Sequence, residues 1–209
     1  MPRTTYGAAT ESAIRKLEQI SYNYEQVSEG SRKTPTSPVR HKVFVSYHAA
    51  DAIEVLDFIE SHTDVFIPRA IGIEEDGSDI INSTDVDYIR QTIRAKYLKD
   101  STVTLVAIGK CTWARRFVDW EIYTSLRNPG RNGLLAVQMP SISGSNPPIP
   151  GRLALNRPTD KEEGYAQYWE YPTSSASLRA HIEAAFRARS SKSHLVKLGG
   201  DLRKANASC

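Results

Sequence analysis

The stretch STVTLVAIGKCTWARRFVDWEIYTSL, residues 101–126, decides the fold of this chain. Its first part, residues 101–108, is a run of β-branched and apolar residues that ends at Gly109-Lys110, which is typical of a fully buried strand in a parallel sheet. Its second part carries apolar and aromatic residues at close to helical spacing, with Thr112 as the expected N-cap. The stretch therefore predicts a strand, a tight turn and a helix.

An acidic residue, Glu121, lies deep in this predicted helix. Ligands of open α/β sheets bind at the carboxyl ends of the strands, and a helix that leaves this edge can carry a carboxylate into the crevice. Such a carboxylate, near aromatic rings and partly removed from water, can stabilise a sugar-like cation in glycosyl transfer. The alternative is a structural salt bridge with Arg115 or Lys110, and the residue types alone favour that alternative.

The composition describes a globular chain with unevenly distributed charge. The 209 residues are 40% hydrophobic and 24% charged, which fits one domain of about 150 residues with extensions. The formal net charge of +3 divides into +2 for residues 1–41, +5 for residues 187–209 and −4 for the residues between them. An acidic body argues against a nucleic-acid-binding surface. Residues 190–209 are expected to form a basic, solvated tail.

The sequence predicts a cytoplasmic protein without a membrane span, a signal peptide or a metal site. No apolar run is long enough to cross a membrane, and the N-terminus lacks the apolar segment of a signal peptide. The two cysteines, Cys111 and Cys209, fit a reducing, cytoplasmic setting better than a disulfide-stabilised scaffold. The five histidines have no paired ligand spacing and the acidic loop around residues 74–79 has no calcium-loop spacing, so no metal site is predicted.

The predicted elements alternate between strands and helices. A helix over residues 8–27 and a linker over residues 28–40 form an N-terminal extension, residues 1–41, that packs weakly or not at all. The strands that follow are expected at residues 42–47, 64–67 (stopped by Pro68), 101–108, 133–139 and 166–171. Helices are expected at residues 51–61, 86–98, 112–126 and 174–188, with an irregular acidic loop at 70–85 and a proline-rich connector without regular structure at 140–164.

This alternation predicts a flavodoxin-like α/β fold over residues 42–189. Its five-stranded parallel sheet has the order 2-1-3-4-5 and is flanked by helices, so the carboxyl ends of the first and third strands form the crevice. Ser46, Tyr47 and His48 follow the first strand and therefore meet Gly109 and the residues after it at one edge. On residue type alone, Ser46 serves the strand end and His48 is an ordinary surface or core histidine.

Other chemistries fail on the residues present. The phosphate-binding motifs GxxxxGK[ST] and GxGxxG and the nucleophile elbow GxSxG are absent. A phospho-acceptor receiver domain needs acidic residues after the first strand and an aspartate that ends the third strand. Those places hold Ser46-Tyr47-His48 and Gly109-Lys110 here. Trp113 and Trp120 are most simply core or interface anchors.

Three ordered stretches resemble the TIR-like domains of bacterial Thoeris anti-phage systems: KVFVSYH at 42–48, YIRQTIRAKYLKDSTVTLVAIG at 88–109 and TWARRFVDWEI at 112–122. The resemblance covers residues 42–185. It implies a TIR fold, cleavage of NAD+ at the nicotinamide–ribose bond, and a cyclic ADP-ribose-type product that activates a separate effector protein. NAD+ is then a substrate and no cofactor is implied, while self-association through the TIR domain stays open.

The resemblance also implies a set of site residues. In TIR enzymes the catalytic glutamate lies in the helix after the third strand, and Glu121 falls on that position. Ser46, Tyr47 and His48 would line the facing wall, and Phe117 would keep an aromatic contact with the substrate. Many TIR enzymes carry Trp and Cys where this chain has Phe117 and Val118, and residues 70–85 differ from the usual TIR loop.

Two other functions remain open from the sequence. Some TIR domains only scaffold assemblies, so one alternative is a non-catalytic TIR interaction module. A nucleotide-binding sensor that holds NAD+ or its product without turnover is the other.

Overall fold

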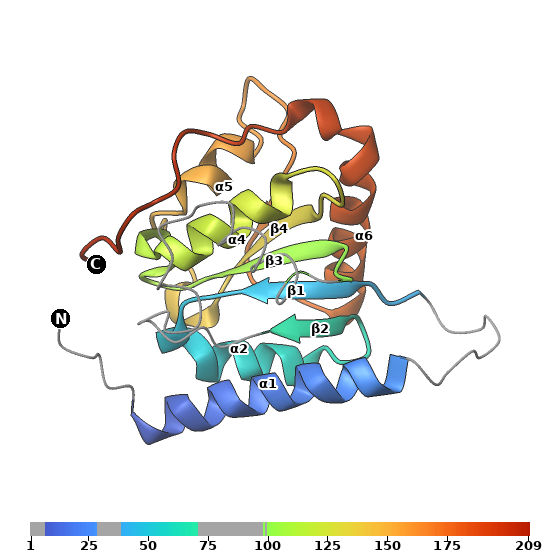
Figure 1. The fold of residues 1–209 in the computed structure, drawn as a ribbon, viewed down its shortest axis with the longest axis vertical. Coiled ribbons are helices and arrows are strands. Elements are labelled where there is room, and N and C mark those ends of the chain that lie inside the picture. Colours follow the sequence, from blue (N-terminus) through green and yellow to red (C-terminus); the bar gives the residue numbers. More distant parts are fainter. Residues whose placement is uncertain (1–6, 29–38, 71–97, 99) are drawn as a thin grey trace.

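The computed structural model of this chain describes residues 7–28, 39–70, 98 and 100–209 (Figure 1). The acidic loop and the helix that the sequence predicts between residues 71 and 97 lie outside this described part.

A single parallel sheet forms the centre of the molecule (Figure 1). Its five strands lie in the order β2-β1-β3-β4-β5, and each neighbouring pair is parallel. The strands are β1 (Lys42–Ser46), β2 (Ile67–Ala70), β3 (Val103–Ile108), β4 (Gly133–Gln138) and β5 (Gln167–Trp169). Every residue of β3 and β4 is buried, as continuous apolar runs predict for the middle of such a sheet. The flavodoxin-like fold and its strand order are therefore confirmed.

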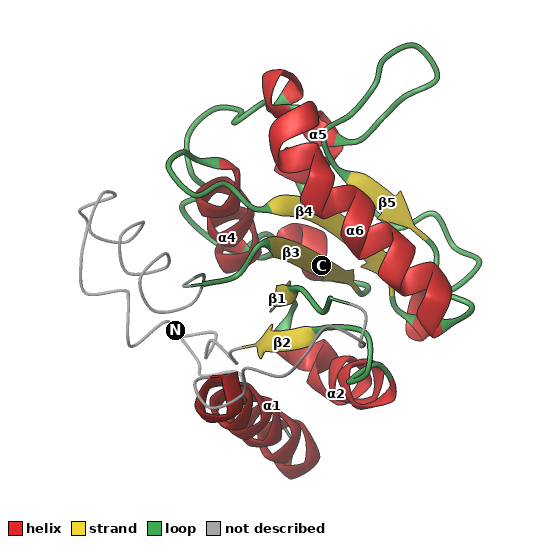
Figure 2. Ribbon diagram, turned by 90° about the vertical axis from the view of Figure 1, so that its right-hand side faces the viewer, coloured by secondary structure: helices red, strands yellow, loops and turns green. Residues whose placement is uncertain are grey.

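Helices cover both faces of the sheet (Figure 2). On one face, α2 (Ala52–Ser61) and α6 (Ser175–Ser191) pack on alternate residues of β1, β3 and β4 such as Val43, Leu105 and Val137. On the other face, α4 (Arg116–Leu126) and α5 (Gly151–Asn156) pack on the intervening residues such as Val106 and Ala136. Alternation of side chains across a strand thus divides the apolar residues into two cores, one for each face.

The N-terminal helix α1 (Ala8–Ser28) is part of the packed molecule. It lies beside α2, and its Ala13 and Leu17 are buried in the same core as the α2 residues (Figure 2). Lys16 also forms an ion pair with Glu60 of α2 at 2.6 Å. The expectation that the N-terminal extension packs weakly or not at all is therefore wrong for α1, because its apolar stripe has a partner.

The C-terminal residues are also packed rather than solvated. After α6 and the short helix η5 (Ser193–Leu195), the chain runs past α5 and along α4 (Figure 1). Its last residue, Cys209, forms a disulfide with Cys111, which follows β3. The expectations of a solvated tail and of a chain without a disulfide are both wrong. The predicted domain boundaries at residues 42 and 189 stay a prediction.

Two smaller expectations also fail for local reasons. The second strand begins at Ile67 and continues through Pro68, which is compatible with a sheet because β2 is an edge strand. The proline-rich segment after β4 is not without regular structure, since it contains the short helix η4 (Pro140–Ile142) and α5. Proline at the start of η4 needs no backbone N–H there, which explains why the segment can be helical.

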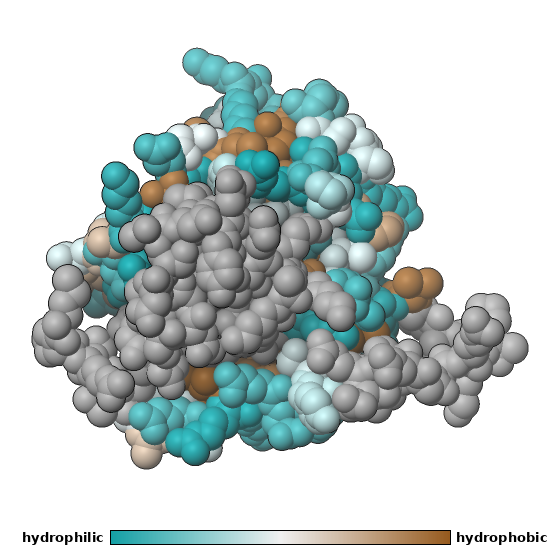
Figure 3. All heavy atoms as spheres, viewed as in Figure 1, coloured by the Kyte–Doolittle hydropathy of each residue, from teal (hydrophilic) through white to brown (hydrophobic). Residues whose placement is uncertain are grey.

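The described surface holds scattered apolar side chains and no long apolar helix. Figure 3 shows a face that is mostly hydrophilic where described residues are drawn, with small hydrophobic patches. Within the described ranges, no helix is both long and apolar enough to cross a membrane. The large hydrophobic side chains exposed at the surface are Tyr22, Val39, Ile53, Leu155 and Trp169.

Candidate functional site

The carboxyl ends of β1 and β3 lie side by side. Ser46 at the end of β1 is in register with Val106 of β3, which is followed by Gly109 and by the short helix η3 (Thr112–Ala114). The helix α4 then begins at Arg116 and runs back over the sheet. This connection brings the predicted site residues of β1 to the same edge as those of α4.

Glu121 is buried and is bonded to the end of β1. Its side chain faces the sheet, the residue is 3% exposed, and Ser46 Oγ donates a hydrogen bond to Glu121 Oε2 at 2.6 Å. Burial raises the pKa of Glu121 to about 8, and the Ser46 hydrogen bond opposes this rise. Within the described residues the carboxylate forms no ion pair, so the alternative of a salt bridge with Arg115 or Lys110 is not realised.

Tyr47 lies beside this carboxylate, and its hydroxyl group forms no hydrogen bond with the described residues. The residue is 9% exposed, and its hydroxyl oxygen has no hydrogen-bond partner in the described part of the chain. Burial raises the pKa of Tyr47, and the charges of Glu121 and of Glu18 in α1 raise it further. A buried phenol without a partner is unfavourable, which makes this hydroxyl a candidate for contact with a ligand.

Phe117 lies one helical turn before Glu121, so the two side chains share a face of α4. Phe117 is 8% exposed and its ring meets the Trp120 ring edge to face, with ring centroids 5.3 Å apart. The Arg116 guanidinium lies over the same pair, 5.0 Å from the Phe117 centroid. Arg116 is a charged residue beside the site that the sequence reading did not single out, and its proximity to the aromatic pair shows only in the folded helix.

His48 is buried at the same edge but in a different role. It directly precedes the short helix η1 (Ala49–Asp51), and its carbonyl oxygen accepts a hydrogen bond from Asp51 N at 2.8 Å. Ser46 is therefore hydrogen-bonded to Glu121, and the charge of Glu121 acts on Tyr47. His48 is brought to the same edge by the chain.

A second carboxylate at this edge was missed by the sequence reading. Asp51 packs so closely on Gly109 that a Cβ at Gly109 would collide with its carboxylate. Thr112 Oγ1 accepts a hydrogen bond from Gly109 N at 2.9 Å and lies 3.4 Å from Asp51 Oδ2. Thr112 therefore braces the turn and does not cap α4, whose N-cap is Arg115. Burial, with the nearby charge of Glu54, raises the pKa of Asp51 to about 6.

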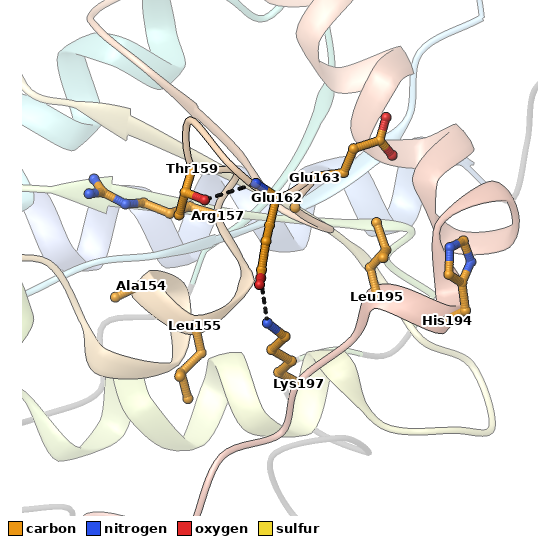
Figure 4. Close-up of a pocket in the computed structure, with 10 residues that line it drawn as sticks. Ala154, Leu155, Arg157, Thr159, Glu162, Glu163, His194, Leu195 and Lys197 are labelled. Atoms are coloured by element: carbon orange, nitrogen blue, oxygen red, sulfur yellow. Dashed lines mark hydrogen bonds and ion pairs between the residues drawn. The ribbon is translucent and has the colours of Figure 1, made fainter.

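No metal centre accompanies these residues in the described ranges. Groups of three or more His, Cys, Asp or Glu side chains that could hold an ion are absent there. A pocket of about 530 Å³ lies elsewhere, lined by residues that precede β5 or follow α6, and so near the amino ends of the strands (Figure 4). Lys197 crosses one side of it to pair with Glu162 at 3.1 Å. Its side chains are mostly exposed, and none comes from β1, β3 or α4.

The fold and the site define the class of this protein. A five-stranded parallel sheet of this order, flanked by helices, is consistent with the flavodoxin-like fold of TIR domains. A family model described as "Thoeris protein ThsB, TIR-like domain" matches residues 44–143. Residues 44–143 of this chain are therefore similar to the TIR-like domain of the Thoeris ThsB family. No curated protein matches the sequence.

The family match covers only residues 44–143, and this range determines which parts of the site it describes. It includes the ends of β1 and β3 and the whole of α4, and therefore all the predicted site residues. It does not reach α1, α5, β5, α6 or the C-terminal residues. Contacts between those parts and α4 are consequently features of this chain that the family match does not describe.

Proposed function

We propose that this protein cleaves NAD+ at the bond between nicotinamide and ribose, with Glu121 as the catalytic residue. The carbon–nitrogen bond breaks with both electrons passing to the nicotinamide nitrogen, so nicotinamide leaves as a neutral molecule from a cationic pyridinium. The ribose then carries oxocarbenium charge. An ionised Glu121 would stabilise this charge and bind ribose hydroxyls.

The observation that carries this proposal is the buried Glu121 carboxyl beside the carboxyl end of β1, held by Ser46 at 2.6 Å. A glutamate that served only as a surface ion pair would be exposed and charged. Burial instead raises the pKa of Glu121 to about 8, so its charge is unfavourable until a cation lies beside it. The pyridinium of NAD+ and the oxocarbenium ion that follows are cations of this kind.

The fate of the ribosyl cation decides the product. Attack by water gives ADP-ribose and releases a proton, whereas attack by the adenine or by a ribose hydroxyl of the same molecule gives a cyclic isomer. We propose the cyclic product, because the buried rings of Tyr47 and of Phe117, which shares a face of α4 with Glu121, supply apolar surface that would exclude water from the ribosyl cation. Such a cyclic ADP-ribose-type molecule would act as a signal for a separate effector protein. Finding only linear ADP-ribose from an activated preparation would contradict this step.

The test is the substitution Glu121→Gln, which keeps size and hydrogen bonding and removes the charge. We expect the variant to fold and bind NAD+ but to release nicotinamide about 10²–10³-fold more slowly, the usual effect of losing one preorganised electrostatic group. Chromatography of nicotinamide and of the ADP-ribose products provides the measurement. A matched control is Glu60→Gln, which removes an exposed carboxylate near the end of α2.

The alternatives predict different outcomes of the same experiment. A wild-type rate of nicotinamide release from folded Glu121→Gln would exclude Glu121 as the catalytic residue. If neither protein releases nicotinamide under any activating condition, a non-catalytic interaction module becomes the better description. Binding of NAD+ without turnover would instead favour the nucleotide sensor.

A further inference from the structure

The C-terminal segment, residues 196–209, crosses the outer side of the helix that carries Glu121. Along this path Arg203 N donates to Asp119 Oδ2 at 2.9 Å, and Trp120 Nε1 donates to the Arg203 carbonyl oxygen at 2.8 Å. Farther on, Ala207 N donates to the Ala114 carbonyl oxygen at 2.9 Å. Figure 1 shows the segment passing from the end of α6 to the side toward which β1 points.

The segment also completes the N-terminus of α4. The first amides of a helix have no partner inside the helix and are usually satisfied by the side chain of the N-cap residue. Arg115 is the N-cap of α4 and provides no such side-chain bond. Asn206 Oδ1 provides it from the C-terminal segment, accepting a hydrogen bond from Arg116 N at 2.9 Å.

One buried cation joins the segment to α4. Arg152 of α5 is 4% exposed, and its guanidinium forms an ion pair with Asp119 at 2.8 Å. The same guanidinium lies 4.7 Å from the ring centroid of Tyr123, also in α4. It donates to three carbonyl oxygens of the C-terminal segment, those of Leu198, Gly200 and Asp201. A planar guanidinium with five donors can serve all these partners together, whereas a lysine cannot.

Asp119 and Glu121 are two residues apart in α4, so their side chains point to roughly opposite sides of the helix. Ser46 fixes the sheet side through Glu121, and Arg152 with the C-terminal segment fixes the outer side through Asp119. The rotation and the depth of α4 therefore depend on both attachments. Misplacement of a reacting group by about 1 Å can reduce turnover by ~10².

We propose that residues 196–209 form a strap that positions α4, and through it Glu121, with Arg152 as the positioning residue and the Cys111–Cys209 disulfide as the lock of the strap. The inference rests on the proposed NAD+ cleavage for its kinetic consequences. The strap lies outside residues 44–143, so the family match does not describe it.

The disulfide between Cys111 and Cys209 can form and break by thiol–disulfide exchange. When it closes, the thiols of Cys111 and Cys209 lose two protons and two electrons to a low-molecular-weight disulfide, which becomes two thiols, and one sulfur–sulfur bond forms in the protein. A dithiol reductant reverses the exchange and becomes the oxidised partner. The hydrogen bonds of Arg203, Asn206 and Ala207 remain available after reduction, so opening the lock loosens the strap without removing it.

The test compares Arg152→Met with Arg152→Lys and with the matched control Arg157→Met. Arg157 is an exposed arginine at the other end of α5, and its side chain lines the pocket of Figure 4. We expect Arg152→Met to lower kcat for nicotinamide release by about tenfold or more with little change in KM, because Glu121 is displaced while the substrate contacts of β1 remain. Arg152→Lys should recover part of kcat, and Arg157→Met should behave as wild type.

A readout that does not depend on turnover separates this inference from the proposed function. Carbon-13 NMR of carboxyl-labelled protein follows the titration of Glu121, and Arg152→Met should lower its pKa because a displaced carboxyl is better hydrated. If no protein releases nicotinamide, the proposed function fails and this titration still decides the inference. An unaltered Glu121 titration in folded Arg152→Met would overturn it.

A second variant covers the case in which Arg152→Met does not fold. Cys209→Ser leaves every side chain of α4 and α5 in place and removes the lock. We expect a fall in kcat of about two- to fivefold, matched by wild-type protein treated with a dithiol reductant and absent when the reductant is added to Cys209→Ser. Equal kcat for reduced and oxidised wild type would show that the disulfide does not control α4.

Discussion

At the scale of single residues, the site is built around a carboxyl that is unfavourable in its charged form. Burial raises the pKa of Glu121 to about 8 from its ordinary value of 4.5. Between these values the folded state keeps a proton that the unfolded state has lost, so stability is complete below the lower value and falls as the pH rises toward the higher one. The ionised form of Glu121 therefore lowers the stability of the folded protein at neutral and alkaline pH.

Glu121→Gln should therefore stabilise the protein, and more so at high pH. Glutamine can accept the Ser46 hydrogen bond and has no charge to bury. We expect the difference in Tm between variant and wild type to be small near about pH 4.5 and to grow to roughly 10 °C or more near about pH 8.5, since a pKa raised from 4.5 to about 8 corresponds to roughly 4–5 kcal/mol and about 1 kcal/mol shifts Tm by ~2–4 °C in a chain of this size. Calorimetry across this pH range is the measurement. A difference that shrinks as the pH rises would contradict the burial of the carboxyl.

The same carboxyl predicts the pH dependence of turnover. If catalysis needs ionised Glu121, kcat/KM for nicotinamide release should rise with pH and level off above about pH 8, because kcat/KM reports the pKa of the free enzyme. Initial rates between about pH 6 and pH 9.5 test this. Asp51 titrates lower, with a pKa of about 6, so the two carboxyls can be separated in the profile by comparison with Asp51→Asn.

Tyr47→Phe should separate substrate binding from folding. The Tyr47 hydroxyl is buried without a partner among the described residues, so removing it should leave stability unchanged or raise it by up to about 1 kcal/mol. If the hydroxyl binds the substrate, KM for NAD+ should rise several-fold in the same variant. Thermal denaturation and initial-rate kinetics give the two numbers, and a stability loss above about 1 kcal/mol would reveal a structural partner for the hydroxyl.

At the scale of elements, α4 depends on a residue 90 positions away in the chain. Asn206→Ala removes the acceptor for Arg116 N, and loss of a helix cap typically costs about 1 kcal/mol. We expect faster hydrogen exchange at the first amides of α4 and a comparable loss of stability. Ser208→Ala, an exposed position two residues farther on, serves as the control and should change neither quantity.

The elements also show what a sequence can predict. The buried strands β3 and β4 and the helix α4 follow from continuous apolar runs and helical spacing, and with them come the sheet order and the position of Glu121. The start of β2 was misplaced because an edge strand tolerates Pro68, and composition does not distinguish edges from centres. The hydrogen bond between Ser46 and Glu121 was not predicted, since 75 residues separate the two side chains and the sheet order only brings their elements to one edge.

At the scale of the whole molecule, both ends of the chain return to the TIR-like domain. The α1 helix packs on α2, and the C-terminal strap reaches Cys111 after β3. The apolar stripe of α1 gave a sequence signal that was available but undervalued. The strap gave none, because Arg152 binds it through the backbone carbonyls of Leu198, Gly200 and Asp201, which every residue type possesses. The positive net charge of the C-terminal residues therefore led to the wrong prediction of a solvated tail.

Removal of the strap should destabilise the whole molecule. Truncation after Val196 eliminates the disulfide and removes three carbonyl partners of Arg152. Loss of a native disulfide alone typically costs about 2–5 kcal/mol. At ~2–4 °C per kcal/mol the Tm should fall by roughly 5–20 °C in calorimetry.

Full-length protein in a dithiol reductant is the control that isolates the disulfide from the other contacts of the strap. The truncated chain should melt below this reduced protein, because reduction leaves the bonds to Arg152, Asp119 and Trp120 in place. Equal Tm values would assign the whole effect to the disulfide. If the truncated chain melts within about 1 °C of oxidised full-length protein, the result supports the prediction of a solvated tail. Changes at a surface without contacts alter stability by under ~0.5 kcal/mol.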